Sequence, residues 1–264
     1  MGIVNVTPDS FSDGGRHGDP DAAIQHGLAL VAEGADVLDV GGESTRPGAV
    51  PVEPAEELRR VVPVIHGLVR HSSVPISIDT RHSLVAEACI AAGATIINDV
   101  EAGRCDPRMW PLVRESGAGY VCMHMQGDPQ TMQDSPSYTD VTAEVADFLR
   151  ERLHSLLASG VDPDCVALDP GFGFGKTVAH NLDLLRRMGE LSGIGRPILV
   201  GISRKGFIGR VTGGDPLQRV AGGIAGTIWA AMAGARIFRT HDVGHTVQAL
   251  RMLDAIQNGP HTPG

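Results

Sequence analysis

Eight short apolar segments recur along the chain, each followed by a glycine- or proline-marked loop and then by an amphipathic stretch. Short runs rich in Val and Ile and bounded by turn residues are typical of buried strands. Because strands and helices alternate strictly, we expect parallel strands covered by helices. The predicted strands are Gly2–Val6, Val37–Val40, Pro75–Ile78, Ile96–Ile97, Gly119–Met123, Val166–Leu168, Ile198–Gly201 and Ile237–Arg239.

The stretches between the strands carry the period of an α-helix. Apolar residues recur at steps of three and four over 141–157 and over 55–69, which places them on one helix face. Eight units of about 33 residues fit a closed (β/α)8 barrel better than an open sheet. We therefore predict one α/β barrel over residues 1–258, followed by a disordered Gly- and Pro-rich tail over residues 259–264.

The charge balance restricts the partners. The 22 Lys and Arg residues against 31 Asp and Glu residues give a net charge of −9, which opposes binding to nucleic acid or to an anionic membrane. Aromatic residues make up only 4% of the chain, too few for base-stacking platforms. No apolar run reaches the roughly 18 residues of a membrane span. We expect small-molecule partners, with no nucleic acid and no membrane, and an anionic ligand would need a local basic site.

The four cysteines, at positions 89, 105, 122 and 165, include no C-x-x-C pair. Their spacing suggests neither a zinc site nor a disulfide framework. We therefore interpret them as reduced thiols of a cytoplasmic protein.

Polar residues end most of the predicted strands. In a (β/α)8 barrel the chemistry lies at the carboxyl ends of the strands. Any single Asp or Asn at such a position is equally explained as a turn or helix-cap residue, and a single Arg or Lys as a solvated cation. Together they predict a polar hole at one rim of the barrel. The residues are Asn5, Asp39, Asp79, Asn98, Asp99, Asp169, Arg239 and His241.

Three loops stand out, although each could be a simple connector. Residues 5–15 offer hydroxyls, acids and glycines that could close over a ligand, and residues 41–49 offer groups suited to an oxyanion. Residues 170–177 look like a G-x-x-x-x-G-K-[ST] phosphate loop, but Pro170 stands where the first glycine is needed. His124 and His180 have no metal-like partner four residues away, which indicates polar loop residues.

Four segments, taken in order, resemble the dihydropteroate synthase family, the target of sulfonamide drugs. They are residues 2–15, 39–49, 169–176 and 203–205. The resemblance spans nearly the whole chain and implies a (β/α)8 barrel. It also implies a transferase of folate biosynthesis, which joins 6-hydroxymethyl-7,8-dihydropterin diphosphate to p-aminobenzoate and releases pyrophosphate.

The same resemblance implies roles for individual residues. The pterin would be bound by Asp79, Asn98, Met123, Asp169, Phe174, Gly201 and Lys205. The diphosphate would be bound by Asn5, Thr45, Arg46, Arg239 and His241, with Asn5 as a ligand of Mg²⁺. The p-aminobenzoate pocket would contain Ser10, Phe11, Thr45, Pro47 and Lys205. The catalytic residues would be Asp79, Lys205, Arg239 and His241. The family also implies a homodimer.

The implied reaction begins with S_N1-like loss of magnesium-bound pyrophosphate, so no nucleophilic side chain is required. From the basic rim we predict that Arg239→Ala lowers turnover far more than stability. From the acids at the pterin edge we predict that Asp169→Ala abolishes pterin binding without unfolding the barrel. Two alternatives remain open at this point. One is a pterin-binding methyltransferase barrel that uses methyltetrahydrofolate, and the other is a catalytically inactive pterin-binding paralogue.

Overall fold

The computed structural model describes residues 1–7, 19–44, 48–128 and 131–259. Within these residues all eight predicted strands are present, each at its predicted place in the chain. The strands are β1 (Gly2–Asn5), β2 (Leu38–Gly41), β3 (Ile76–Asp79), β4 (Ile96–Asp99), β5 (Gly119–Met123), β6 (Val166–Asp169), β7 (Leu199–Val200) and β8 (Ile237–Phe238).

The strands close into a barrel. Strands β1 to β6 pair in sequence order, all parallel, and β7 pairs with β8. A bridge between Leu168 and Ile198 joins β6 to β7, and a bridge between Gly2 and Thr240 joins the end of β8 to β1. The Thr240 N–H donates to the Met1 carbonyl at 2.9 Å, which supports the second junction. The predicted (β/α)8 barrel is therefore confirmed.

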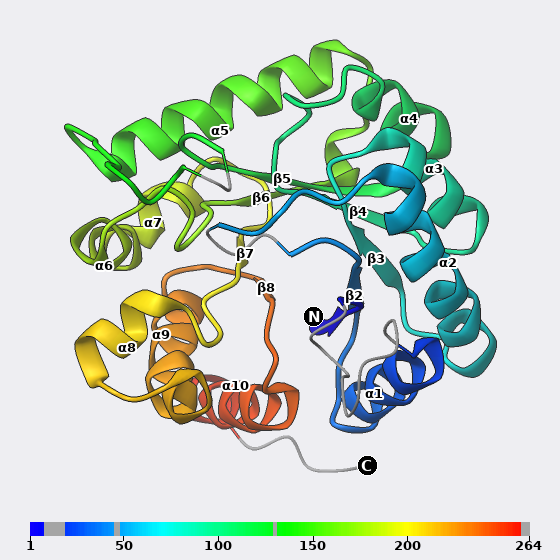
Figure 1. Cartoon of the computed structure of the whole chain (residues 1–264). Helices are drawn as coiled ribbons and strands as arrows, with labels where there is room; N and C mark the ends of the chain where they lie inside the picture. The colour runs from blue at the N-terminus through cyan, green and yellow to red at the C-terminus, as the bar shows by residue number, and fades with distance from the viewer. Residues whose placement is uncertain (8–18, 45–47, 129–130, 260–264) are drawn as a thin grey trace.

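An outer ring of helices surrounds the strands (Figure 1). At the closing junction the Gly244 N–H, in the first turn of α10, donates to Glu33 Oε2 just beyond α1 at 3.0 Å. Of the predicted tail, residues 260–264 lie outside the described part of the chain. The helices are α1 (Pro20–Ala32), α2 (Pro54–His71), α3 (Ser83–Ala91), α4 (Met109–Ser116), α5 (Val141–Ala158), α6 (Val178–Arg186), α7 (Met188–Ser192), α8 (Gly206–Thr212), α9 (Val220–Met232) and α10 (Val243–Asn258).

Apolar side chains fill the amino-terminal half of the barrel interior. Ile96 and Ile237 begin their strands, and they pack with Met1 against the buried side chains of Val121, Ala167 and Leu199. The larger core lies between the strands and the helices. Because the lower half of the barrel is filled, the polar side chains at the carboxyl ends of the strands stand above an apolar floor.

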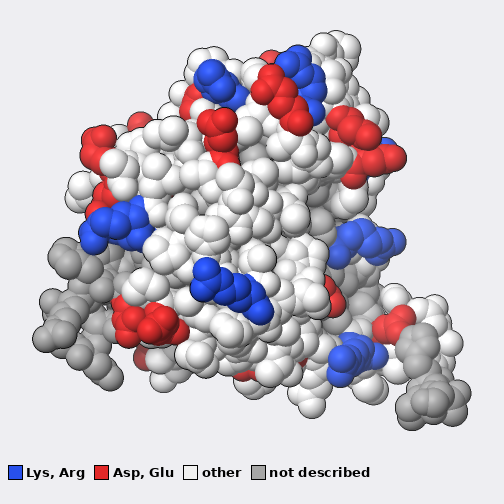
Figure 2. Space-filling view, turned by 90° about the vertical axis from the view of Figure 1, so that its right-hand side faces the viewer, with Lys and Arg blue, Asp and Glu red and all other residues white. Residues whose placement is uncertain are grey.

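Charged side chains of both signs are interspersed on the side of the molecule where α2 and α3 lie (Figure 2). On that face they do not form a broad field of one sign. In the described part of the chain, no helix combines the length and the apolar character needed to cross a bilayer.

Candidate active site at the carboxyl ends of the strands

The strand register brings the predicted polar residues to one level of the barrel. Asn5 pairs with Gly41, Gly41 with Asp79, and Asp79 with Asn98. Residues in register on parallel strands point to the same face of a sheet. One strand further on, Met123 pairs with Asp169. Four of the predicted site residues therefore lie at the same rim as Asn5, each on a different strand.

Arg239 ties the centre of this rim together. It follows β8, and its Nε donates to Asp39 Oδ2 and its Nη2 to Asp79 Oδ2, both at 2.6 Å. Asn98 Nδ2 also donates to Asp39 Oδ2, at 3.1 Å. Asp39 is fully buried and so connects β2, β4 and β8. The sequence predicts Asp39 as a strand-ending acid, but no motif in it indicates this bridging role.

Two carboxylates share the one guanidinium. Burial raises the pKa of Asp79 above its usual range, the Arg239 charge opposes the shift, and Asp39 adds to it. Burial lowers the pKa of Arg239, but Asp39 and Asp79 outweigh this and hold it above the usual value. Asp39 Oδ1 is buried and has no hydrogen-bond partner among the described residues. Asp39 Oδ1 can therefore accept a further hydrogen bond, in addition to those that Asp39 Oδ2 accepts from Arg239 and Asn98.

Asp169 is the acid of the opposite wall, at the end of β6. Its Oδ1 accepts a hydrogen bond of 2.7 Å from the Gly171 N–H. Burial raises the pKa of Asp169 to about 6, although that hydrogen bond and the charges of Lys205, Arg239 and Lys176 act in the opposite direction. Near neutral pH this carboxylate is therefore mostly ionised, and it can accept hydrogen bonds from a ligand.

Phe174 and Lys205 form the apolar and cationic side of the rim. The Lys205 Nζ lies 3.9 Å from the centroid of the Phe174 ring, a cation–π contact. Phe174 also packs in a small buried cluster with Met123, Val100, Met125 and Met132. The predicted pairing of Met123 and Phe174 as apolar wall residues is consistent with this packing.

Lys176 fastens the loop that carries Phe174. Its Nζ lies 2.9 Å from His124 Nδ1 and donates to the carbonyls of Gly171 and Phe174, each at 3.0 Å. Burial lowers the pKa of Lys176 to about 7 and that of His124 to about 2, so the imidazole is neutral and accepts from the amine. The sequence predicts only a polar loop residue at position 124, whereas in the structure His124 is buried directly after β5.

His241 and Gly201 lie beside this network. The His241 N–H donates to Ser203 Oγ at 3.1 Å, and its Nδ1 lies 3.1 Å from the same oxygen. Ser203 thus positions His241, a role that the sequence analysis missed. A Cβ on Gly201 would lie 3.7 Å from the Cβ of Arg239, an ordinary contact distance, so Gly201 lies directly beside that side chain.

Asn5 is half-buried at the end of β1. Its carboxamide oxygen is a donor type that Mg²⁺ accepts, and Mg²⁺ commonly takes few protein ligands and completes its shell with water and substrate phosphates. The donor chemistry therefore fits the predicted ion. Five further predicted site residues fall outside the described part of the chain, namely Ser10, Phe11, Thr45, Arg46 and Pro47.

The fold and the rim together define a (β/α)8 barrel with a small-molecule site at the carboxyl ends of its strands, built from buried acids, an amide and cations. The family model described as pterin binding enzyme matches residues 1–241. The chain belongs to this pterin-binding family.

Relatives of known activity agree with that assignment. The chain is 45% identical over 255 residues to the dihydropteroate synthase of Escherichia coli K12, an alignment that covers 97% of this chain and 90% of the relative. Two solved structures of the Xanthomonas albilineans dihydropteroate synthase are also similar. The complex with 4-aminobenzoic acid has a TM-score of 0.93 at 50% identity and covers 98% of this chain and 93% of that one. The complex with 7,8-dihydropteroate has a TM-score of 0.90 at 48% identity and covers 98% and 94%.

Proposed function

We propose that the protein is a dihydropteroate synthase, a transferase that joins 6-hydroxymethyl-7,8-dihydropterin diphosphate to p-aminobenzoate in folate biosynthesis. The observation that carries the proposal is the set of buried acceptors at the rim, Asp79, Asn98 and Asp169, with Asp79 bound to the Arg239 guanidinium. The near full-length identity to synthases of this activity supports the same conclusion.

The pterin lies in this rim with its amino and ring N–H groups toward the acids. A flat 2-amino-4-oxo heterocycle needs acceptors along one edge, which Asp79, Asn98 and Asp169 supply. Phe174 and Met123 provide apolar contact, and Gly201 leaves room for the ring. The Lys205 ammonium lies over the Phe174 ring. From there it donates a hydrogen bond to the pterin, on the side away from the acids.

The diphosphate binds toward solvent. We assign its oxygens to Thr45, Arg46, Arg239 and His241, and we assign Asn5 as the protein ligand of Mg²⁺. When bound, the ion supplies positive charge for the departing pyrophosphate. Asp39 and Asp79 hold the Arg239 guanidinium in place, so its orientation does not depend on the substrate.

The chain lowers the barrier by stabilising separated charge. The C–O bond to the diphosphate breaks, and its electron pair leaves with pyrophosphate beside Arg239 and His241. Positive charge then develops on the pterin methylene and is stabilised by the Asp79 carboxylate. The amine of p-aminobenzoate attacks this carbon and loses a proton. Its pocket comprises Ser10, Phe11, Thr45, Pro47 and Lys205, and closure of that pocket would exclude water from the cation.

We also propose a cytoplasmic homodimer. Helices α9 and α10 pack against each other and expose the apolar side chains of Trp229, Met232, Met252 and Ile256. Such side chains favour a protein–protein contact. The four cysteines are free thiols in the structure, which is compatible with a reducing compartment.

Pyrophosphate release tests the activity. We expect release that requires the pterin diphosphate, p-aminobenzoate and Mg²⁺ together. Methyl transfer from methyltetrahydrofolate without such release would identify the methyltransferase alternative. Pterin binding without any turnover would identify an inactive paralogue, and either result would reject the synthase.

A further inference from the structure

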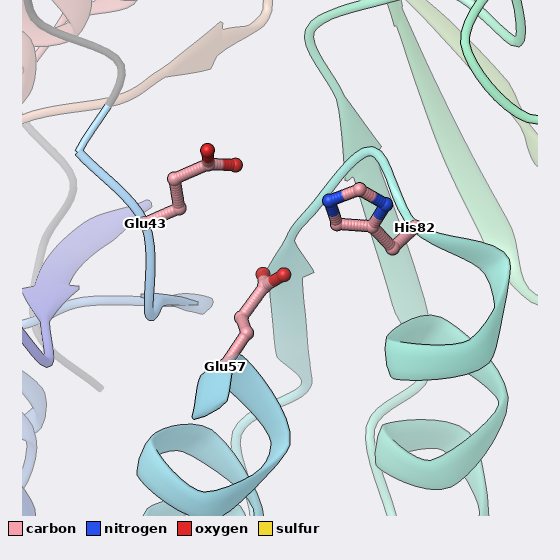
Figure 3. Close-up of side chains that lie close together, drawn as sticks. All are labelled: Glu43, Glu57 and His82. Carbon is pink, nitrogen blue, oxygen red and sulfur yellow. The ribbon is translucent and has the colours of Figure 1, made fainter. Parts of the chain in front are cut away.

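Three side chains of metal-ligating types meet beside the rim network, between the segment after β2, the first turn of α2, and the start of α3 (Figure 3). Glu43 follows β2, Glu57 belongs to α2, and His82 directly precedes α3. One ligand atom of each lies within 4.8 Å of the others. Acidic clusters are common, so the proximity alone does not define a site.

Glu57 is the second observation. Its side chain is fully buried, and neither carboxylate oxygen has a hydrogen-bond partner among the described residues. Figure 3 shows the carboxylate pointing toward the space between Glu43 and His82. The Thr80 side chain is near enough to favour the ionised form of Glu57 and so to oppose part of the effect of burial on its pKa. Burial raises the pKa of Glu57 to about 7, because the ionised form is costly without a partner, and a cation beside it would stabilise that form.

His82 has the same need. Its Nε2 is buried and has no partner among the described residues. Nothing in the described part of the chain therefore uses this nitrogen, which remains free to donate its lone pair. A carboxylate and an imidazole that face each other without direct hydrogen bonds are readily satisfied by one cation between them.

Glu43 is held in place by the protein. Arg81 Nη2 donates to Glu43 Oε1 at 2.9 Å and Arg81 Nε to Oε2 at 3.2 Å, and the Val52 N–H donates to Oε1 at 3.2 Å. A carboxylate offers about four lone-pair sites, so these three bonds leave capacity for a metal. Because Arg81 already compensates the charge of Glu43, the ionised form of Glu57 is left without a compensating cation, which favours binding of a metal ion.

We propose that Glu43, Glu57 and His82 bind one divalent transition-metal ion of the zinc type, at a site separate from the diphosphate and from Asn5. Two carboxylate oxygens and one imidazole nitrogen suit Zn²⁺ better than Mg²⁺ or Ca²⁺, which take oxygen ligands. Ligand atoms around tetrahedral Zn²⁺ stand about 3.3 Å apart. The three ligand atoms, which lie within 4.8 Å of one another, would have to draw closer to reach that spacing.

The consequence concerns the base of the loop after β2. Glu43 lies in the chain directly before Ser44 and two residues before Thr45. A bound ion would link this segment to α2 and α3, in addition to the link that Arg81 already makes. It would thereby fasten the start of the segment to the helical layer of the barrel.

The test uses the full chain, freed of metal by a chelator, with no pterin or p-aminobenzoate present. Zn²⁺ is titrated in competition with a chromophoric chelator, and Co²⁺ absorption reports the ligand set. Glu57→Gln and His82→Gln remove one ligand each. His71→Gln is the matched control, because His71 is exposed at the end of α2. Thermal melts without metal confirm that each variant is folded.

We expect one Zn²⁺ per chain, a loss of affinity of more than about tenfold in each ligand variant, and no change in the control. The Co²⁺ spectrum of His82→Gln should lose the signature of nitrogen ligation, which keeps the test decisive if Glu57→Gln does not fold. Absence of one-to-one binding, or equal affinity in His82→Gln and the wild type, would overturn the proposal. Because no substrate is present, this failure would be distinct from failure of the synthase assignment.

Discussion

Arg239 contacts two buried acids, and these contacts change the expected effect of removing it. The sequence predicted that Arg239→Ala would affect turnover far more than stability. In the structure the substitution leaves Asp39 and Asp79 without their cation. Removing one partner of a buried ion pair typically costs about 3–5 kcal/mol. We therefore expect a clear loss of stability in urea denaturation as well as lost turnover.

The control for this experiment is Arg236→Ala, since Arg236 is exposed and directly precedes β8. It should change the free energy of unfolding by no more than about 0.5 kcal/mol. If Arg239→Ala is equally neutral, the ion pairs with Asp39 and Asp79 do not stabilise the fold.

Asp169 gives pterin binding a pH dependence. Its pKa of about 6 means that acidification below this value protonates the carboxylate and removes an acceptor. One unit below the pKa, about a tenth of the sites remain ionised, so affinity for 6-hydroxymethyl-7,8-dihydropterin should fall about tenfold between pH 7.5 and pH 5. Asp169→Asn should bind weakly at both pH values. Calorimetry that finds the wild type and Asp169→Asn equally tight at pH 7.5 would exclude this carboxylate from the pterin site.

At the residue scale, the sequence predicted side chains whose position is set by a single strand. Asp79 ends β3 and Asn98 is the last residue but one of β4, so their place at the rim follows from the strand alone. The partnership of Lys176 with His124 joins residues 52 positions apart and depends on how the loop after β6 folds over β5. Neither residue has a local pattern that predicts this contact, and the positions of the partners are fixed only by tertiary packing.

At the element scale, the loop after β6 depends on one glycine. Gly171 has a φ of +67°, and a Cβ there would lie far inside contact distance of the His124 carbonyl oxygen. The backbone cannot move aside cheaply, because Gly171 also donates to Asp169 and accepts from Lys176. We expect Gly171→Ala to destabilise the protein by several kcal/mol and to weaken pterin binding.

Gly206→Ala is the matched control. Gly206 is the first residue of α8, has no positive φ, and a Cβ there would meet nothing within 4 Å. Alanine is the better helix former, so stability should be unchanged or higher by up to about 1 kcal/mol. Thermal unfolding of the two variants tests this difference, and Gly171→Ala should melt at the lower temperature. Similar melting temperatures would contradict the structural role of Gly171 in the loop after β6.

The elements themselves were predictable because each strand is short, apolar and bounded by turn residues. Most boundaries shift by only one or two residues: the segment predicted at Ile198–Gly201 is a strand only over Leu199–Val200. The helices of the sixth unit were harder to predict from the sequence. Two short helices, α6 and α7, follow β6, where the strand–helix repeat predicts one. Residue Arg187 separates them with a non-helical backbone that no glycine or proline signals.

At the scale of the whole molecule, closure of the barrel is predicted by the number of strand–helix units and not by any local sequence motif. The bridge between Gly2 and Thr240 joins residues at opposite ends of the chain, so neither segment alone predicts it. Eight alternating units imply it, because an open parallel sheet of that number would leave two unpaired edges. The same closure brings Arg239 from the last strand to Asp39 and Asp79 on the second and third.

The association of whole molecules can be tested at α9. Met232 is 64% exposed there, and Trp229 on the same helix is 53% exposed. If this surface is the dimer contact, Met232→Asp would bury a carboxylate in an apolar interface, at a cost that favours dissociation. Light scattering should then give about twice the 27.7 kDa chain mass for the wild type and the single-chain mass for Met232→Asp.

Leu84→Asp is the control for a general effect of added charge. Leu84 is 57% exposed on α3, which lies across the barrel from α9 (Figure 1). Because a solvated aspartate near the start of a helix is favourable, this variant should stay folded and dimeric. A wild-type protein that is monomeric, or a Met232→Asp variant that dimerises as strongly as Leu84→Asp, would remove α9 from the interface. The rim acids and Arg239 all come from one chain, so loss of the dimer should leave pterin affinity intact even where it lowers thermal stability.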